Sequence, residues 1–201
     1  MAVTTSRDAY FEAGLDILST SGYGSLKLAA LCTRLGVTTG SFYHYFKNWA
    51  DYTAKLLEYW LDSRTRVDVA HLRSEPDPEK RIDDLLSYGL RLPHQAEHSF
   101  RIWGATDPRV SAVVESVDRE RYSVVHEAVS DLVGPTNAHR YASWALYLLT
   151  GYDFVNDTAD TETLEWVAQH LVDAIKADAA RQSLGTRPHA EDEVPEKRRT
   201  T

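Results

Sequence analysis

Apolar residues recur at spacings of three and four through most of this 201-residue chain, and this pattern constrains its fold more than any other feature. Phe11, Leu15 and Leu18 form one such stripe, and the valines between positions 110 and 129 form another. The spacing puts side chains on one face of an α-helix, whereas a half-buried strand alternates with a period of two. No segment of the sequence alternates in that way, so the sequence predicts an all-α fold.

Capping and helix-breaking residues divide these stripes into separate helices. We expect Thr5 to cap a first helix that ends at Gly22, and Gly36 to end a short helix over 26–35. The Asp-Pro pairs that begin at 77 and 107 combine an N-cap residue with a proline suited to the first helical position. The other helices are expected over about 39–45, 48–71, 78–92, 97–105, 108–133, 137–155 (with Asn137 as its cap) and 161–182.

The formal net charge of −8 is spread unevenly along the chain. Residues 1–47 hold four Lys or Arg against three Asp or Glu, whereas the remainder holds 18 basic against 27 acidic residues. The N-terminal quarter is therefore mildly basic at +1, and the rest carries −9. Because the local field matters more than the total, this asymmetry permits binding of nucleic acid at the N-terminal end without demanding it.

Several classes of protein are disfavoured by the composition and by missing motifs. The single cysteine, Cys32, excludes an internal disulfide and a CxxC metal site, and it is compatible with a reducing cytoplasm. The N-terminus does not resemble a signal peptide, and no run of 18 apolar residues suggests a membrane span. We found no P-loop, GxGxxG or catalytic-triad motif, so we expect a cytoplasmic protein that is not an enzyme and has no cofactor.

The stretch GVTTGSFYHYF, residues 36–46, joins two of the expected short helices through a glycine-containing turn, which is the helix-turn-helix arrangement. The first residues of a recognition helix face base edges in the major groove, which assigns that role to Thr38, Thr39 and Gly40. Phe42 and Phe46 are four apart and should point inward. The polar side chains Ser41, Tyr43, His44 and Lys47 can donate hydrogen bonds to phosphates, which fixes the register on DNA without reading its sequence.

The run GYGSLKLAALCTRLGVTTGSFYHYFKN resembles the DNA-binding domain of tetracycline-repressor (TetR) family regulators. Gly36-Val37, the Thr pair, Gly40 and the stretch 41–46 match the family pattern position by position. Two positions depart from it. Trp49 stands where the family often has a phosphate-binding Lys, and Ala29-Ala30 replaces a frequent Arg-Asp pair. Lys27 and Lys47 are expected to supply phosphate contacts instead.

The resemblance implies a homodimeric, ligand-responsive transcriptional regulator, a repressor that binds a palindromic operator in double-stranded DNA. It implies a helix-turn-helix domain over 1–47 and a larger helical domain over 48–183 for effector binding and dimerisation. The tail over 184–201 is polar, with two prolines, and we expect it to be disordered.

Two sets of residues in the larger domain are candidates for the remaining functions. Aromatic side chains with polar groups suit an effector pocket for an unknown small molecule, and an apolar face on the last two helices suits a dimer interface. The pocket candidates are Tyr59, Trp60, Tyr88, Trp103, Tyr122, Tyr147 and Tyr152. The interface candidates are Trp144, Leu148, Trp166, Leu171 and Ile175.

Two other interpretations remain open on the sequence alone. HQAEH, residues 94–98, matches the HxxEH pattern of some zinc peptidases, in which His94 and His98 would bind zinc and Glu97 would act as the base. We expect this stretch to lie in a connection or a first helical turn. The second alternative is an all-helical ligand-binding or adaptor protein that does not bind DNA.

Overall fold

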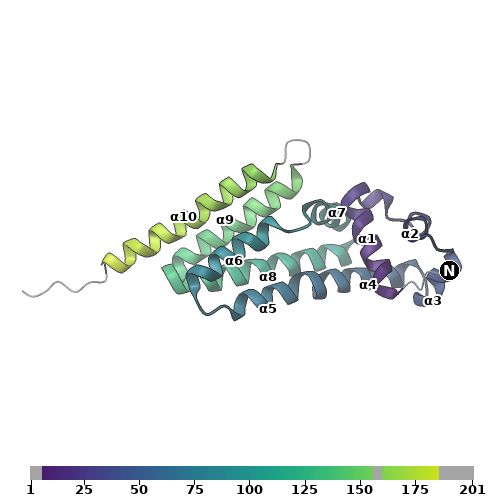
Figure 1. Ribbon diagram of the computed structural model, residues 1–201, viewed down its shortest axis with the longest axis horizontal. Helices are drawn as coiled ribbons and strands as arrows, with labels where there is room; N and C mark the ends of the chain where they lie inside the picture. Colours follow the sequence, from purple (N-terminus) through teal and green to yellow (C-terminus); the bar gives the residue numbers. More distant parts are fainter. Residues whose placement is uncertain (1–5, 156–159, 186–201) are drawn as a thin grey trace, which may run out of the picture.

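The computed structural model describes residues 6–155 and 160–185, with the backbone alone at 63–65 and 185, and confirms the all-α fold: these residues form helices and no strand (Figure 1). None of the described helices is both long and apolar enough to cross a membrane. The helices are α1 (Arg7–Ser21), the 3₁₀ turn η1 (Tyr23–Ser25), α2 (Leu28–Leu35), α3 (Thr39–Tyr45), α4 (Trp49–Tyr59), the π-helical segment η2 (Trp60–Arg66), α5 (Val67–Ser74), α6 (Pro78–Leu90), α7 (His94–Gly104), α8 (Pro108–Val133), α9 (Pro135–Phe154) and α10 (Thr161–Gly185).

Four helix starts differ from the sequence expectation, and one of them is that of α2, which begins at Leu28 rather than at position 26. Ser6, rather than Thr5, caps α1 by accepting a hydrogen bond from Ala9 N–H, and Thr5 itself lies outside the described residues. α7 begins directly after Pro93, three residues earlier than expected, because a proline can precede the first turn without losing a hydrogen bond. α9 begins at Pro135, so Asn137 lies in its first turn and donates to Asp178 on α10 instead of capping.

The end of the last helix also differs from the sequence expectation, which placed it near position 182. α10 extends to Gly185, so the first two residues of the expected tail are helical. Positions 186–201 of that expected tail lie outside the described residues.

The long helix expected over 48–71 is found as α4, η2 and α5 in continuous succession. The π-helical segment that separates α4 from α5 begins at Trp60, whose ring stacks on Phe100 of α7 with centroids 3.9 Å apart. π-helical insertions shift the register of the helix that follows them and are frequent at functional sites. The segment lies between α4 and α5, where the N-terminal helices meet the body of the protein (Figure 1).

α1, α2 and α3 gather at one end of the elongated molecule, and α5, α6, α8, α9 and α10 extend away from them (Figure 1). An aromatic core that includes Tyr10, Phe11, Phe42 and Phe46 holds the N-terminal helices together. The same buried cluster continues into α7 and α8, where it includes Phe100 and other side chains. The N-terminal helices are thus packed on the body through α7 rather than tethered by a linker.

A close approach between α1 and α4 fixes the position of α4 at this end. The hydroxyl of Tyr52 donates to the carbonyl oxygen of Tyr10 at 3.0 Å in a buried hydrogen bond. A Cβ atom at Gly14 would lie 2.1 Å from that hydroxyl oxygen. Glycine is therefore needed at position 14 for the tyrosine to pass.

We predict that Gly14→Ala destabilises the protein by about 1–3 kcal/mol, because the added methyl group overpacks the contact with Tyr52. Urea unfolding followed by circular dichroism measures the loss. Adding Tyr52→Phe should recover part of it, since the nearest clashing atom is removed. Gly24→Ala is the matched control, because no atom lies within 4 Å of its added Cβ. Equal stability of the Gly14 and Gly24 variants would refute the steric explanation.

Candidate nucleic-acid interface

α2 and α3 are joined by a three-residue turn whose geometry follows from its residues. Gly36 has a φ of 65°, in the left-handed region that favours glycine, and its N–H donates to the carbonyl of Thr33. Val37 N–H donates to the carbonyl of Cys32 at 3.0 Å. Thr38 then caps α3 by accepting from Ser41 N–H. The predicted helix-turn-helix is therefore present with its expected turn.

Phe42 and Phe46 anchor α3, as predicted, and are 0% and 1% exposed. Tyr10 of α1 meets both rings edge to face, with centroid distances of 5.9 and 5.5 Å. The Tyr10 hydroxyl also donates to Ser41 Oγ at 2.9 Å. Ser41 is consequently half-buried and already holds one partner, which leaves only its own O–H to donate to a phosphate.

The other residues assigned to DNA contact lie on the outer surface of the same helices. Tyr43 is 56% exposed, so the ring next to the Phe42 anchor faces solvent. This exposed set gives α3 an outer face of hydroxyl, imidazole and ammonium donors. The exposed members are Lys27, Thr38, Thr39, Gly40, Tyr43, His44 and Lys47.

Trp49 occupies the first position of α4 and is part of the local core rather than a surface contact. Its ring lies 5.0 Å from that of Tyr52 and 6.1 Å from that of Phe42, measured between centroids. A lysine at this position would lose these ring contacts. The departure from the family pattern thus exchanges a cation for packing that supports α3.

A carboxylate also lies close to this surface, at Asp51. Asn48 Oδ1 accepts from Asp51 N–H at 2.8 Å, and the Asp51 carboxylate accepts from Lys47 N–H at 3.0 Å. The ammonium group of Lys55 donates to the same carboxylate at 2.9 Å. The hydrogen bond from Lys55, together with that from Lys47, lowers the pKa of Asp51. Its charge is thereby balanced locally, which limits repulsion of an approaching phosphate.

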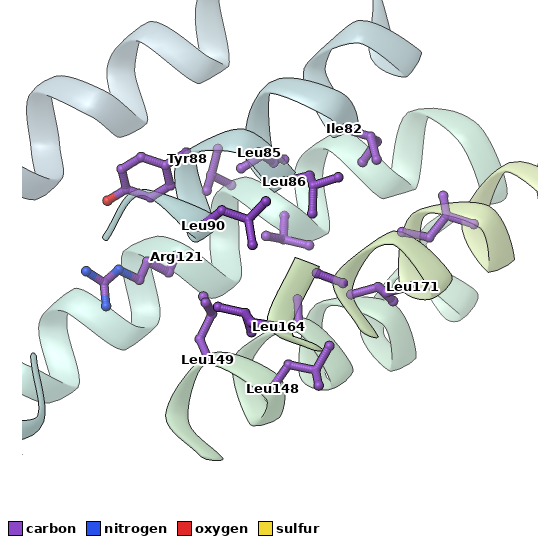
Figure 2. A pocket seen from close by; sticks show the side chains of 16 residues that line it. Ile82, Leu85, Leu86, Tyr88, Leu90, Arg121, Leu148, Leu149, Leu164 and Leu171 are labelled. Atoms are coloured by element: carbon purple, nitrogen blue, oxygen red, sulfur yellow. The ribbon is translucent and has the colours of Figure 1, made fainter. Parts of the chain in front are cut away.

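An apolar cavity of about 90 Å³ lies in the body between α6, α8, α9 and α10 (Figure 2). Leucine is the most frequent residue in its wall, and the leucines include Leu85, Leu86, Leu149 and Leu164. Figure 2 shows Tyr88 and Arg121 at one end, with the hydroxyl and the guanidinium on the same side. Among the seven aromatic pocket candidates, only Tyr88 lines this cavity.

The other six pocket candidates do not line this cavity, because their rings make other contacts. Three of them pack where the N-terminal helices meet the body, and three lie on or near the surface. Tyr59 stacks on Phe11, Trp60 on Phe100 and Trp103 on Tyr23, while Tyr122 hydrogen-bonds His139, Tyr147 is 72% exposed and Tyr152 meets His94 edge to face.

A second, more polar cavity of about 450 Å³ lies at the junction between the N-terminal helices and the body, and we call it the junction cavity. Its wall comes from α1, η2, α5, α6 and α7. Trp60 lines the junction cavity, and Tyr88 lines both this cavity and the apolar one. Trp60 is thus the one other aromatic candidate that borders either of these two spaces.

A buried ion pair between α7 and α8 was not anticipated from the sequence. Arg121 donates to both carboxylate oxygens of Glu97, at 3.0 and 2.9 Å, and the two residues are 4% and 2% exposed. Only the tertiary structure brings these residues together, since 24 positions separate them.

The same pairing bears on the zinc interpretation of HQAEH. The stretch forms the start of α7, so the expected first helical turn is confirmed and the connection is not. Its Glu97 is bound by Arg121, and His94 Nδ1 lies 2.9 Å from Asp153 Oδ1. Within residues 6–155 and 160–185, no three His, Cys, Asp or Glu side chains gather in a way that could hold a metal ion.

The candidate dimer residues divide into two groups. Trp144 on α9 and Trp166 on α10 are 39% and 62% exposed and remain available to a partner. Leu171 and Ile175 are buried within the subunit, and with Leu148 they line the apolar cavity. The expectation for these three is corrected, because the helical repeat turns them to the inner face of α9 and α10.

Residues 11–51 match the family model described as "Bacterial regulatory proteins, tetR family". The chain is also 38% identical over 97 residues to the transcriptional regulator AcuR of Cereibacter sphaeroides. That alignment covers 48% of this chain and 43% of AcuR, so the chain matches less than half of its relative's length.

Two of the solved structures that share the fold are themselves described as transcriptional regulators. A TetR-family transcriptional regulator from Streptomyces coelicolor superimposes with a TM-score of 0.70 at 17% identity, covering 87% of this chain and 95% of the other. FadR from Bacillus subtilis, in complex with stearoyl-CoA, gives a TM-score of 0.63 at 10% identity and covers 86% and 99% of the two chains. At these identities the likeness concerns the fold alone.

We predict that Glu97→Gln lowers the free energy of unfolding by about 3–5 kcal/mol, because it leaves the charge of Arg121 buried and uncompensated. Urea unfolding at neutral pH measures the effect. Replacing the pair together, by Glu97→Leu with Arg121→Met, should cost less than the single change. Glu58→Gln, on the exposed surface of α4, is the control and should change stability by no more than about 0.5 kcal/mol. A single variant as stable as this control would contradict the role of the pair.

Proposed function

Because the chain belongs to the TetR family of bacterial regulatory proteins, we propose that it is a transcriptional regulator that binds a specific sequence in double-stranded DNA. The observation that carries this proposal is the family match over 11–51, which spans the helix-turn-helix and its donor-rich outer face. The proposed action is repression by a homodimer on a palindromic operator, in the cytoplasm where the chromosome lies. We propose that residues 1–47 form the DNA-binding domain and that residues 48–183 form the domain for effector binding and dimerisation.

The proposed contacts follow from the position of each side chain on α3. Thr38 and Thr39 begin the helix and would face base edges, where a hydroxyl can donate or accept and a methyl group can touch thymine. Gly40 allows close approach of the helix to the groove. Tyr43, His44 and Lys47 would donate to phosphates, with Lys27 at the cap of α2 as a further cation.

A dimer would supply more positive charge to DNA than one chain, whose residues 1–47 carry a formal charge of only +1. Two copies double the phosphate contacts and hold two recognition helices about 34–36 Å apart, or at a multiple of that spacing. Most of the acidic remainder of each chain, on α5, α6, α8, α9 and α10, extends away from α3 (Figure 1). Trp144 and Trp166 support an interface formed by α9 and α10.

We place the effector in the apolar cavity of the body. The structurally similar FadR is in complex with stearoyl-CoA, whose acyl chain is apolar, and this supports the use of the fold for a ligand with an apolar chain. At about 90 Å³ the cavity is smaller than the roughly 300–1,000 Å³ of typical ligand pockets, so its leucine side chains would have to move apart on binding.

A contiguous set of contacts links this cavity to the DNA-binding end. Arg121 lines the cavity and holds Glu97 of α7, and Ser99 of the same helix donates to the carbonyl of Leu18 on α1 at 2.7 Å. An effector that displaces α7 would therefore displace α1, and with it α4 and the spacing of the two recognition helices. This requires the effector to bind the two spacings with different affinity.

Selection of bound sequences from random DNA tests the proposal. We expect a palindrome whose half-sites lie about 10–10.5 base pairs apart, centre to centre, or a multiple of that. On the selected site, Lys47→Ala and Tyr43→Phe should weaken binding to all sequences alike, because they remove phosphate contacts. Lys47→Ala should also reduce the slope of log affinity against log salt by about one per subunit.

The matched control is Lys80→Ala, on α6 at a distance from α3, which should leave both affinity and salt slope unchanged. Unchanged affinity in both the Lys47 and Tyr43 variants would remove the phosphate assignment. Failure to bind any DNA, with or without candidate ligands, would instead favour a ligand-binding or adaptor protein.

We predict that Trp166→Glu converts the dimer to a monomer, because a charge replaces a large apolar side chain in the proposed interface. Light scattering after size-exclusion chromatography measures the mass. Ile102→Glu on α7, at a residue that is also exposed, should leave the dimer intact. A wild-type protein that is already monomeric, or a Trp166→Glu dimer of unchanged stability, would refute this interface.

A further inference from the structure

The two cavities of the body meet at one residue. Tyr88, on the last turns of α6, lines both the apolar cavity and the junction cavity. Its ring lies at the end of the leucine-lined space, and its hydroxyl points away from the labelled leucines (Figure 2). A molecule that lies among the leucines with its polar group at this end would bring that group beside Tyr88 and Arg121.

Three buried hydrogen-bond donors lie at this boundary, and in the described part of the protein their one polar interaction here is that of the Tyr88 hydroxyl with Arg121. They are Nε1 of Trp60 in the wall of the junction cavity, Nε of Arg121 in the wall of the apolar cavity, and the hydroxyl of Tyr88 between them. The residues that carry them are 2%, 4% and 9% exposed. Burial raises the pKa of Tyr88, against the opposing effect of Arg121, so its hydroxyl keeps the proton.

The chemistry of these atoms selects one kind of polar group. Indole and guanidinium N–H groups can only donate, so they call for an acceptor. An ammonium group has no acceptor to offer. The complementary group is therefore an oxygen with free lone pairs.

The charges around the junction cavity decide against an anionic oxygen. Glu12, Asp16, Asp68 and Glu97 contribute to its wall, whereas Arg91 is its one cationic wall residue among the described positions. Asp16 is paired with Arg34 and Glu97 with Arg121, so the surroundings remain net negative by one charge. A carboxylate would be repelled and would also disturb a buried ion pair that is already balanced.

We propose that the effector is an uncharged, largely aliphatic molecule with a carbonyl oxygen, which lies in the apolar cavity and accepts a hydrogen bond from Tyr88. This rests on the proposed function only in calling the bound molecule an effector. The carbonyl suits the site better than a hydroxyl, because a hydroxyl would bring a donor of its own among donors.

The position of the carbonyl also connects binding to the rest of the molecule. Nε of Arg121 is the neighbouring donor, and the same guanidinium holds Glu97 through its other two nitrogens. A carbonyl that draws Arg121 toward the cavity would strain its contact with α7. Recognition of the ligand and displacement of α7 would then depend on the same side chain.

Three probes of equal carbon number test the proposal on the full-length protein: methyl heptanoate, octanoate and octylammonium. Binding is measured by isothermal titration calorimetry and by the shift in the midpoint of thermal unfolding. We expect methyl heptanoate to bind at least about tenfold more tightly than either charged probe. Tighter binding of a charged probe, equal binding of all three, or binding of none would overturn the proposal.

Tyr88→Phe tests the hydrogen bond while keeping the ring. It should weaken binding of methyl heptanoate about tenfold and change the stability of the unliganded protein little, because the hydroxyl loses only its interaction with Arg121. Tyr141→Phe is the matched control, since its hydroxyl donates to the carbonyl of Ala174 outside the cavity and its removal should not affect the ester. An ester affinity that Tyr88→Phe leaves unchanged would show that Tyr88 is not the donor.

DNA binding is measured on the same preparation without any probe, which separates this inference from the proposed function. A protein that binds its selected site but not the ester refutes the ligand class alone. A protein that binds the ester but no DNA refutes the regulator and leaves the ligand site standing.

Discussion

The packing of α7 is the constraint on which the rest of the arrangement depends. This helix makes a hydrogen bond to α1 through Ser99, a ring stack with η2 through Phe100, and a buried ion pair with α8 through Glu97. Each contact fixes α7 against a different element, and two of them involve polar groups that must stay paired once buried. The N-terminal helices therefore share a core with the body, and the orientation of α3 is set by packing that begins well outside the helix-turn-helix.

The sequence was most informative where local chemistry decides the structure. The apolar spacing indicated the fold class, and Gly36, Phe42 and Phe46 took the roles expected of them because turn geometry and helical periodicity act within a few residues. Helix starts were less certain, as Ser6 and Pro135 show. Neighbouring residues of similar capping ability compete there, and small differences in packing decide between them.

The cavity and the partner surface depended on information that the linear pattern lacks. Leu148, Leu171 and Ile175 lie on the same helices as Trp144 and Trp166, and the direction of each side chain is set by neighbouring helices far away in sequence. Aromatic content was a poor guide to the cavity because three of the rings, including Trp60 and Trp103, fill the junction with the N-terminal helices and three others lie on or near the surface. A search for clustered leucines on α6, α9 and α10 would have identified more of the residues that line the cavity. The pairing of Glu97 with Arg121 had no local signal at all.

The neutral outer face of α3 has a consequence for how such a protein would find its site. Sliding along DNA depends on many weak ionic contacts with successive phosphates, and this face offers mainly hydroxyls with few cations. A protein of this kind would spend little time on random DNA and would search mainly by diffusion through solution. Most copies would then be free at any moment, and free copies are the ones that a ligand reaches without having to compete with the chromosome.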